Sequence, residues 1–330
     1  MKMINLDNEL SDLAPPYGAF LTKSFGNTAG TCAYKLYIPS GAELEPRPLI
    51  IMLHGSSQSA DDFAAGTRMN FAAETNSCYV AFAEQSPSAN SLKCWNWFQS
   101  SHQARGYGEP SIIAGLVQQI ISEHNIDPRR IYVAGLSAGG AAAAVVAQAY
   151  PDIFAALGVH SGLPCGVARD LTSAFAAMQG YSFFTPTQGD AIPTIVFHGD
   201  QDRTVHPRNG AEVAIGAAAG ASYVREVERG TVPGGRSYSR SVHRNQSGKQ
   251  MIEDWVIHGV GHAWSGGSNA GSYTDPLGPD ASREMIRFFL EHELDDQERK
   301  SSVTGVGPLS SQTKPAPKAV EMRLTDGSSR

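Results

Sequence analysis

Continuous apolar runs alternate with helix-like segments through the middle of the chain. Residues 47–53, "RPLIIML", form an apolar run that ends at "HG", which is typical of a strand covered on both faces. Residues 109–125, "EPSIIAGLVQQIISEHN", place apolar side chains on one face at helical spacing. Because such strands and helices alternate, the pattern predicts an α/β fold with a mostly parallel central sheet and helices on both faces.

The same alternation continues toward the carboxyl terminus. Further strands are predicted within 78–85, 131–133, 154–162, 192–202 and 254–264. Further helices are predicted within 61–76, 141–147, 207–220 and 279–294. Together they form one repeated strand–helix pattern, so a single large domain is expected.

Composition divides the chain into three parts. Residues 1–46 are interpreted as a segment that leads into the sheet, and 47–294 as the α/β domain. Within that domain, 86–108 form a polar and aromatic insertion, and 223–249 have the pattern of antiparallel strands joined by a polar turn. Residues 295–330 are polar, contain Pro and Ser and have no apolar period, so they are predicted to be a disordered tail.

One serine stands where a strand pattern becomes a helix pattern. Residues 135–139 read "GLSAG", after the β-branched run at 131–133 and before a helix rich in alanine. This G-x-S-x-G pattern in a strand–turn–helix context exposes the serine hydroxyl at the top of a sheet, next to a helix amino terminus. Ser137 is therefore the candidate nucleophile.

A serine nucleophile needs a histidine base and an acid that orients it, and in this setting the chain order is serine, acid, histidine. Asp200 and Asp202 follow a buried strand, and Asp202 is preferred because it lies deeper in the turn, whereas Asp200 can fix the turn itself. His258 and His262 follow the last strand. His262 is preferred because it lies inside a glycine loop that can carry it over the serine.

Two backbone amides and three aromatic side chains complete the expected site. The amides of Ala138, directly after the nucleophile, and of Ser56, after "HG", are predicted to form an oxyanion hole, with Ser57 as the alternative to Ser56. Trp95 and Trp97 of "CWNWF", and Trp264 beside His262, are candidates to line the substrate pocket, although core packing is an equally good interpretation.

Charge and composition exclude several classes of function. The net charge of −6 and the lack of a basic cluster leave no electrostatic footprint for nucleic acid, and no apolar run is long enough to cross a membrane. The first twenty residues have no apolar signal-peptide core, which favours a cytoplasmic protein; an extracellular location by non-standard export is the alternative. The four cysteines lack C-x-x-C spacing, and one optional disulfide stays open. His54, His198, Asp200 and Asp202 lack compact ligand spacing, so no metal is predicted.

Several motifs together resemble the polyhydroxybutyrate (PHB) depolymerase-type esterases of the α/β-hydrolase superfamily. The matching stretches are "LHGSSQSADDFAAGTRMN", "CWNWF", "GEPSIIAGLV", "RIYVAGLSAGGAAAAV", "YPDIFAALGVHSGLP", "FHGDQDRTVHPRN" and "GHAWSGGSNAGSYTDPLGPDASREMIRFFLEH", across most of residues 47–292. These esterases are close to carbohydrate esterase family 1, which includes feruloyl and acetylxylan esterases. The resemblance implies an α/β-hydrolase fold and a triad of Ser137, Asp202 and His262, the residues already reached from the pattern.

The resemblance also implies a substrate class. The expected function is a serine esterase that hydrolyses carboxylic esters without a cofactor, acting on short-chain poly(3-hydroxyalkanoate) or its oligomers. A feruloyl or acetylxylan esterase is the first alternative, and a non-catalytic binding protein with a hydrolase fold is the second; the sequence leaves the oligomeric state open. Relatives often carry cysteine at the position of Ser56, so the resemblance implies that Cys94 lacks a disulfide partner here.

Overall fold

The protein is built around one ten-stranded sheet, seen here in a computed structural model that describes residues 12–181, 184–185 and 192–295. The predicted tail at 295–330 therefore lies outside the described residues beyond its first position. The strands are β1 (Ala19–Asn27), β2 (Gly30–Ile38), β3 (Arg47–Leu53), β4 (Tyr79–Glu84), β5 (Ile126–Leu136), β6 (Ala156–His160), β7 (Thr194–Gly199), β8 (Val224–Thr231), β9 (Ser237–Arg244) and β10 (Gln250–Ile257).

The strand order separates a parallel centre from antiparallel edges. The sheet runs β1-β2-β4-β3-β5-β6-β7-β10-β9-β8. All neighbours from β4 to β10 pair in parallel, whereas β1 and β2 at one edge and β8 and β9 at the other pair antiparallel. The carboxyl ends of the central strands consequently meet at one edge, where ligand-binding loops of α/β sheets gather.

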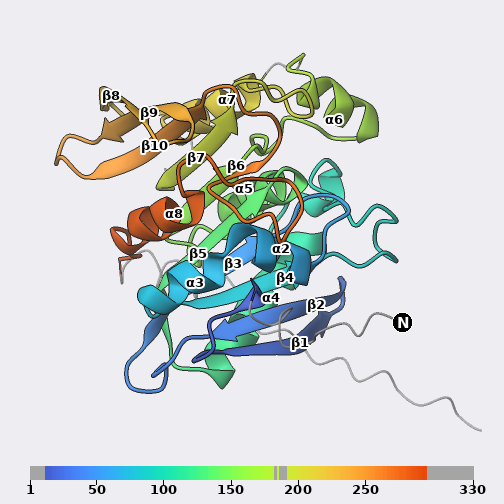
Figure 1. The fold of residues 1–330 in the computed structure, drawn as a ribbon. Coiled ribbons are helices and arrows are strands. Elements are labelled where there is room, and N and C mark those ends of the chain that lie inside the picture. The colour runs from blue at the N-terminus through green and yellow to red at the C-terminus, as the bar shows by residue number, and fades with distance from the viewer. Residues whose placement is uncertain (1–11, 182–183, 186–191, 296–330) are drawn as a thin grey trace, which may run out of the picture.

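Helices cover both faces of the sheet. One face carries α2 (Ala60–Thr67), α3 (Met69–Thr75) and α8 (Ala281–Leu290), which lie together in Figure 1. The other face carries α4 (Gly108–Glu123), α5 (Ala138–Ala149) and α7 (Arg208–Ala217). The remaining short elements are α6 (Leu171–Met178), the 3₁₀ turn Ser100–His102, β11 (Trp264–Ser265) and β12 (Thr274–Asp275).

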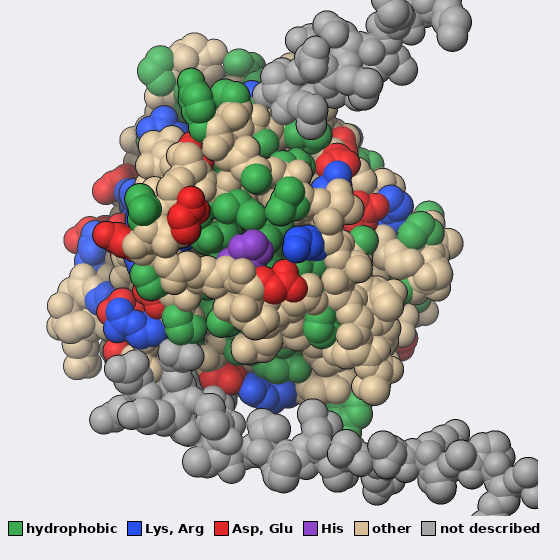
Figure 2. Space-filling model, turned by 90° about the horizontal axis from the view of Figure 1, so that it is seen from below, with side chains coloured by type: hydrophobic (Ala, Val, Ile, Leu, Met, Phe, Trp, Pro, Cys, Tyr) green, Lys and Arg blue, Asp and Glu red, His purple; other side chains and the backbone are tan. Residues whose placement is uncertain are grey.

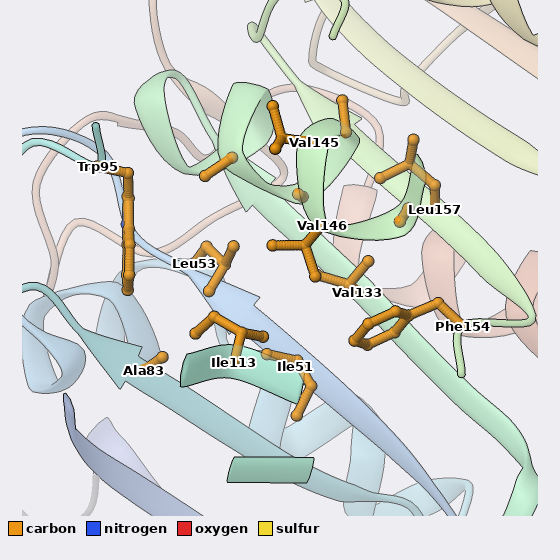
Figure 3. Packing of buried hydrophobic residues seen from close by; sticks show 14 of the residues in the cluster. Ile51, Leu53, Ala83, Trp95, Ile113, Val133, Val145, Val146, Phe154 and Leu157 are labelled. Carbon is orange, nitrogen blue, oxygen red and sulfur yellow. The ribbon is translucent and has the colours of Figure 1, made fainter. Parts of the chain in front are cut away.

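Alternation along each central strand divides the core into two layers. In β3, Ile51 and Leu53 pack into the layer under α4 and α5, whereas Ile50 and Met52 pack into the layer under α2 and α8. This is the period of two that a strand imposes on its side chains. Figure 3 shows the first layer, where Trp95 stands beside Leu53 and Ile113. Burial on both faces explains why the central strands are uninterrupted apolar runs.

Two elements differ from the predicted ones. The helix predicted over 61–76 is broken at Arg68, whose φ is 52°, and continues as a second helix. The break leaves the carbonyl of Thr67 free to accept the Ser282 hydroxyl of α8 at 2.6 Å. The other difference lies at 1–46, where the leading segment contains β1 and β2 as a hairpin of the sheet.

The edge of the sheet formed by β1 and β2 is a mixed surface. Figure 2 shows this face, where hydrophobic side chains gather near the centre and Lys and Arg stand beside Asp and Glu. Lys23 of β1 and Glu123 of α4 form an ion pair in which Lys23 Nζ lies 3.4 Å from Glu123 Oε2. Among the helices that the structure describes, none is long and apolar enough to cross a membrane.

Candidate active site

Ser137 lies at a sharp turn between β5 and α5. Its φ of 57° and ψ of −120° are unusual for a residue with a side chain. Such a conformation costs about 1–3 kcal/mol and persists only where surrounding contacts enforce it. Here the Ser137 amide donates to the His160 carbonyl of β6 at 2.8 Å, and the Ser137 carbonyl accepts from Ala141 in the first turn of α5.

The two glycines of the motif are required by close backbone approach. A Cβ at Gly139 would lie 2.0 Å from the Leu53 carbonyl oxygen of β3. A Cβ at Gly135 would lie 2.3 Å from the Gly139 carbonyl carbon. Both distances are far below van der Waals contact, so only glycine fits at either position. The spacing of the motif is thus explained by the packing of α5 against β3 and β5.

Asp202 and His262, the predicted acid and base, form a hydrogen-bonded pair. The Nδ1 atom of His262 lies 2.7 Å from Asp202 Oδ2. The Asp202 side chain is fully buried and that of His262 is 10% exposed. Asp202 follows β7 and His262 follows β10, and these two strands are parallel neighbours. A carboxylate on Nδ1 fixes the tautomer that leaves Nε2 free to accept a proton.

Asp202 is held as a carboxylate by its neighbours. Its Oδ1 accepts the amides of Thr204 and Val205, both at 2.9 Å, and its Oδ2 lies 3.3 Å from His198 Nε2. Burial alone would raise the pKa of Asp202, but hydrogen bonds from His198 and His262, with the charge on His262, outweigh it and hold the pKa well below its usual value. The acid therefore stays ionised beside the imidazole.

Asp200 and His258, the alternatives considered for the acid and base, also pair with one another. His258 Nδ1 lies 2.9 Å from Asp200 Oδ2, and His258 Nε2 lies 2.9 Å from Ser239 Oγ on β9. Asp200 Oδ1 accepts the Gly259 amide at 2.7 Å. In addition to the Asp202–His262 pair, the structure thus contains a Ser–His–Asp chain of hydrogen bonds formed by Ser239, His258 and Asp200.

His160, a residue to which sequence reasoning assigned no role, bonds both to the Ser137 turn and to the loop that carries His262. Its ring stacks between Phe197 and Trp264, with centroids 5.7 and 5.0 Å away. Its Nε2 accepts the Ser265 amide at 2.9 Å. Burial lowers the pKa of His160 well below its ordinary value, and His198 and His262 nearby lower it further. His160 thus links the Ser137 turn, through its backbone carbonyl, to the loop that carries His262, through its neutral ring.

The turn after β3 lies against the nucleophile and offers one unused amide. A Cβ at Gly55 would lie 3.6 Å from the Cβ of Ser137. The Ser57 amide donates to the Leu92 carbonyl at 2.8 Å, which removes it as the alternative oxyanion donor. Within the described part of the chain, the amides of Ser56 and Ala138 donate to no other group. They are the two amides that the sequence predicts as oxyanion-hole donors.

A buried polar network holds that turn in place. His54 Nδ1 lies 2.7 Å from the Gly55 carbonyl, and His54 Nε2 accepts the Gln85 amide at 3.0 Å. The indole of Trp95 donates to the His54 carbonyl at 3.0 Å. Glu109, also buried, accepts the Asn96 amide at 2.8 Å and so anchors the insertion that carries Trp95. Because every member is paired, the network fixes one conformation of the turn.

The three tryptophans lie in the core rather than on an open wall. Trp95, Trp97 and Trp264 are only 2%, 4% and 1% exposed. The Trp264 indole donates to Ser282 of α8 at 3.1 Å. This burial is at odds with the expectation that they contact substrate, because the space between helices and sheet is filled by them. The three tryptophans therefore pack in the core next to the candidate site and do not line an open pocket.

All four cysteines are free thiols, so none of them forms a disulfide. Burial raises the pKa of the Cys94 thiol, and a hydrogen bond with the Ser56 side chain opposes that rise. Cys94 and Ser56 are therefore neighbours.

Among the described residues, no group of three or more His, Cys, Asp or Glu side chains is arranged to hold a metal ion.

Comparison with known sequences adds a family to this geometry. The profile of the family described as "Esterase PHB depolymerase" matches residues 32–214, more than half of the chain. Poly(3-hydroxyalkanoate) depolymerase C of Paucimonas lemoignei is 30% identical over 262 residues, which cover 74% of this chain and 62% of that protein. Acetylxylan esterase A of Emericella nidulans is 29% identical over 205 residues, which cover 56% of this chain and 66% of that protein. The chain thus spans less than two thirds of either relative.

A solved structure gives the fold. Acetyl xylan esterase from Aspergillus awamori matches with a TM-score of 0.64 at 20% identity, over 83% of this chain and 99% of that chain. The fold is accordingly that of the α/β-hydrolases, as predicted. The family match includes Ser137 and Asp202 and stops before His262, so the case for His262 rests on its hydrogen bond to Asp202.

Proposed function

The chain belongs to the esterase PHB depolymerase family, and from this premise we propose that it hydrolyses carboxylic esters through an acyl-enzyme on Ser137. Asp202 orients His262, which acts as the general base and then as the general acid. The amides of Ser56 and Ala138 stabilise the oxyanion. No cofactor takes part in these steps.

The reaction proceeds in two balanced halves. Ser137 Oγ attacks the ester carbonyl carbon while His262 Nε2 takes its proton, and the tetrahedral oxyanion lies against the Ser56 and Ala138 amides. Collapse expels the alcohol, which receives the proton from His262. Water then attacks the acyl-enzyme, with His262 as base, and releases the carboxylic acid and free Ser137.

One observation carries the proposal: the strained backbone of Ser137, with φ at 57°, at the amino terminus of α5 and against the Gly55 turn. Backbone strain of this kind persists only where the surrounding structure enforces it, and it is concentrated at active sites. The buried Asp202–His262 pair, two strands away across β6, supplies the acid and base that a serine nucleophile needs.

The substrates we propose are short-chain hydroxyalkanoate esters, either soluble oligomers or amorphous polyester. This proposal is supported by the similarity to the depolymerase of Paucimonas lemoignei. A second candidate is an acetyl or feruloyl esterase that acts on carbohydrate esters. It is favoured by the similarity to Acetylxylan esterase A of Emericella nidulans. Both candidates use the same three residues and differ only in what binds around them.

The test is the release of 3-hydroxybutyrate from amorphous polyhydroxybutyrate, with Ser137→Ala run alongside and with acetylated xylan and feruloyl sugar esters in the same assay. Release from polyester that disappears in the variant supports the proposal. Activity on the sugar esters alone selects the second candidate. Activity that survives Ser137→Ala would refute the nucleophile in either case.

A further inference from the structure

Tyr273 has a backbone conformation that a bulky residue rarely adopts. Its φ is 53°, in the left-handed region. For a side chain of this size that region is a steric outlier, and such outliers concentrate at functional sites. Of the described non-glycine residues with positive φ, Ser137 is the proposed nucleophile, and Tyr273 is the one with an aromatic side chain.

The residues on both sides of Tyr273 enforce this strain. The Ser272 amide donates to Asp62 Oδ1 of α2 at 2.9 Å, and its hydroxyl donates to Asp62 Oδ2 at 2.5 Å. The Thr274 hydroxyl donates to the Ser268 carbonyl at 2.9 Å. The Tyr273 carbonyl accepts the Trp264 amide at 2.7 Å. The conformation is therefore fixed on each side by specific bonds.

The same bonds connect Tyr273 to the oxyanion turn, that is, residues 55–58 after β3, which carry the Ser56 amide. The Gln58 side-chain amide donates to Asp62 at 2.9 Å and to the Ser272 carbonyl at 3.2 Å. The Gln58 side-chain oxygen accepts the Gly55 amide at 2.9 Å. The loop that presents Tyr273 and the turn that presents the Ser56 amide are thus positioned by one side chain.

The Tyr273 ring lies beside the proposed catalytic base and remains open to solvent. Its centroid is 6.4 Å from that of His262, with the ring planes at 76°. The residue is 50% exposed, whereas the tryptophans of the core are buried. Its hydroxyl makes no hydrogen bond to any described residue. An aromatic surface and a free hydroxyl are therefore available next to the reacting atoms.

A second exposed apolar side chain flanks the oxyanion turn. Leu92, in the insertion after β4, is 69% exposed, and its carbonyl accepts the Ser57 amide at 2.8 Å. The turn at 55–58 is therefore bonded to Leu92 through Ser57 and to the loop of Tyr273 through Gln58. An ester carbonyl held by this turn would have an apolar side chain within reach from each neighbouring loop.

We propose that Tyr273 contacts the bound ester and, with Leu92, selects substrates that extend beyond the scissile bond as a chain of apolar ester units. The inference rests on the proposed function and adds the specificity residue to it. A small acyl ester occupies the oxyanion turn alone, whereas an oligoester also covers Tyr273. Loss of the ring consequently weakens binding of the extended substrate and leaves the small one nearly unaffected.

The experiment compares two esters in three variants. We expect Tyr273→Asn to lower kcat/KM for a linear trimer of 3-hydroxybutyrate by about tenfold, and for p-nitrophenyl acetate by less than about twofold. Tyr273→Phe, which keeps the ring, should stay within about threefold of the wild type on the trimer. Leu92→Ser should show the same selective loss as Tyr273→Asn, to a smaller extent.

Thermal unfolding separates a substrate contact from a structural role. Asparagine tolerates the left-handed region, so Tyr273→Asn should keep or raise Tm, by about 2 °C, while activity on the trimer falls. Ser77→Gly is the matched strain control, because Ser77 also has a positive φ, of 53°, but lies before β4 at the opposite end of the strands. It should change stability alone. Tyr17→Ala, at a residue that is 82% exposed, controls for loss of an exposed ring.

Three outcomes decide the matter. A selective loss on the trimer with a Tm that is unchanged or higher supports the inference. Equal losses on both esters, or none, would overturn the role of Tyr273 while the esterase proposal stands. A wild-type protein that hydrolyses neither ester nor the sugar esters would refute the proposed function itself.

Discussion

Two Asp–His pairs lie on the same two loops, and only one of them has the surroundings of a catalytic site. Asp202–His262 and Asp200–His258 have nearly equal hydrogen-bond lengths, 2.7 and 2.9 Å. Each acid follows β7 and each histidine follows β10. Bond geometry alone therefore does not distinguish them.

Burial does distinguish them. The Asp202 and His262 side chains are 0% and 10% exposed, whereas those of Asp200 and His258 are 32% and 39% exposed. Asp200–His258 is the outer pair and Asp202–His262 the inner pair. Water screens the outer pair, so the charge of Asp200 has little effect on the His258 imidazole. The inner pair lies in a medium of low dielectric, where a fixed carboxylate acts strongly on the imidazole.

The serines differ even more. Ser137 occupies a strained turn at a helix amino terminus, with unused amides at Ala138 and Ser56. Ser239 lies inside β9, where its backbone is paired with β8 on one side and β10 on the other. The sheet ladder uses the amides around Ser239, so no donors remain for an oxyanion. A Ser–His–Asp chain becomes catalytic only where amides and burial accompany it.

Replacing the histidines should produce the largest difference between the pairs. We expect His262→Ala to lower kcat by about 10⁶-fold, because the serine loses its base. His258→Ala should change kcat by less than about threefold, because it removes only an exposed pair. Steady-state kinetics on a soluble ester measure both. If His258→Ala were the more damaging variant, the assignment of the base would be reversed.

The acids should differ by a smaller factor. Asp202→Asn, which preserves shape but removes the charge, should reduce kcat by about 10⁴-fold. Asp200→Asn should reduce it by less than about threefold, since its bonds to His258 and the Gly259 amide act on the loop only. The two substituted aspartates lie two positions apart in the same turn, so each variant serves as the control for the other. Equal losses would mean that the turn, and not the carboxylate, matters.

The acid stability of the protein should show the same order. Hydrogen bonds outweigh burial and lower the pKa of both Asp202 and Asp200, so the unfolded chain binds more protons than the folded one as pH falls. The stabilisation is present above the unfolded pKa, about 3.9, and is lost as pH falls through the folded pKa. The loss should be larger for Asp202, whose side chain is fully buried, than for Asp200, whose side chain is 32% exposed and screened by water.

Denaturant unfolding between about pH 5 and pH 2 measures this dependence. Asp202→Asn should flatten the fall of the unfolding free energy with acid much more than Asp200→Asn does. An unchanged slope in Asp202→Asn would show that its carboxylate is not selectively stabilised in the fold.

The smallest effect is expected at Ser239. Ser239→Ala removes one hydrogen bond to an exposed histidine and should change the unfolding free energy by about 0.5 kcal/mol or less. Activity should be unchanged. Denaturant titration with a parallel ester assay checks both, and a substantial loss of activity would place Ser239 in the reaction after all.

Sequence alone located the inner pair because its signals are local. Strand ends, the G-x-S-x-G turn and the order of serine, acid and histidine identified Ser137, Asp202 and His262, and the structure pairs the last two. The hairpin of β1 and β2 was not predicted, because β1 is an edge strand with mostly exposed side chains and little apolar period.

Other features depend on contacts between distant segments, which no local pattern reveals. The helix break at Arg68 accommodates α8, which follows some 200 residues later in the chain. The burial of Trp95, Trp97 and Trp264 depends on what packs against them. His160 and Tyr273 gain their positions from β7 and α2, so their neighbourhood to the site is visible only in three dimensions.

The most direct test of the account is to label the protein with a fluorophosphonate, a reagent that phosphonylates activated serines, and to map the modified peptide by mass spectrometry. We predict one label per chain on Ser137, no label on Ser137→Ala, and full labelling of Ser239→Ala. A label on Ser239, or an unlabelled wild type, would contradict the claim that Ser137 is the activated nucleophile and that the inner pair activates it.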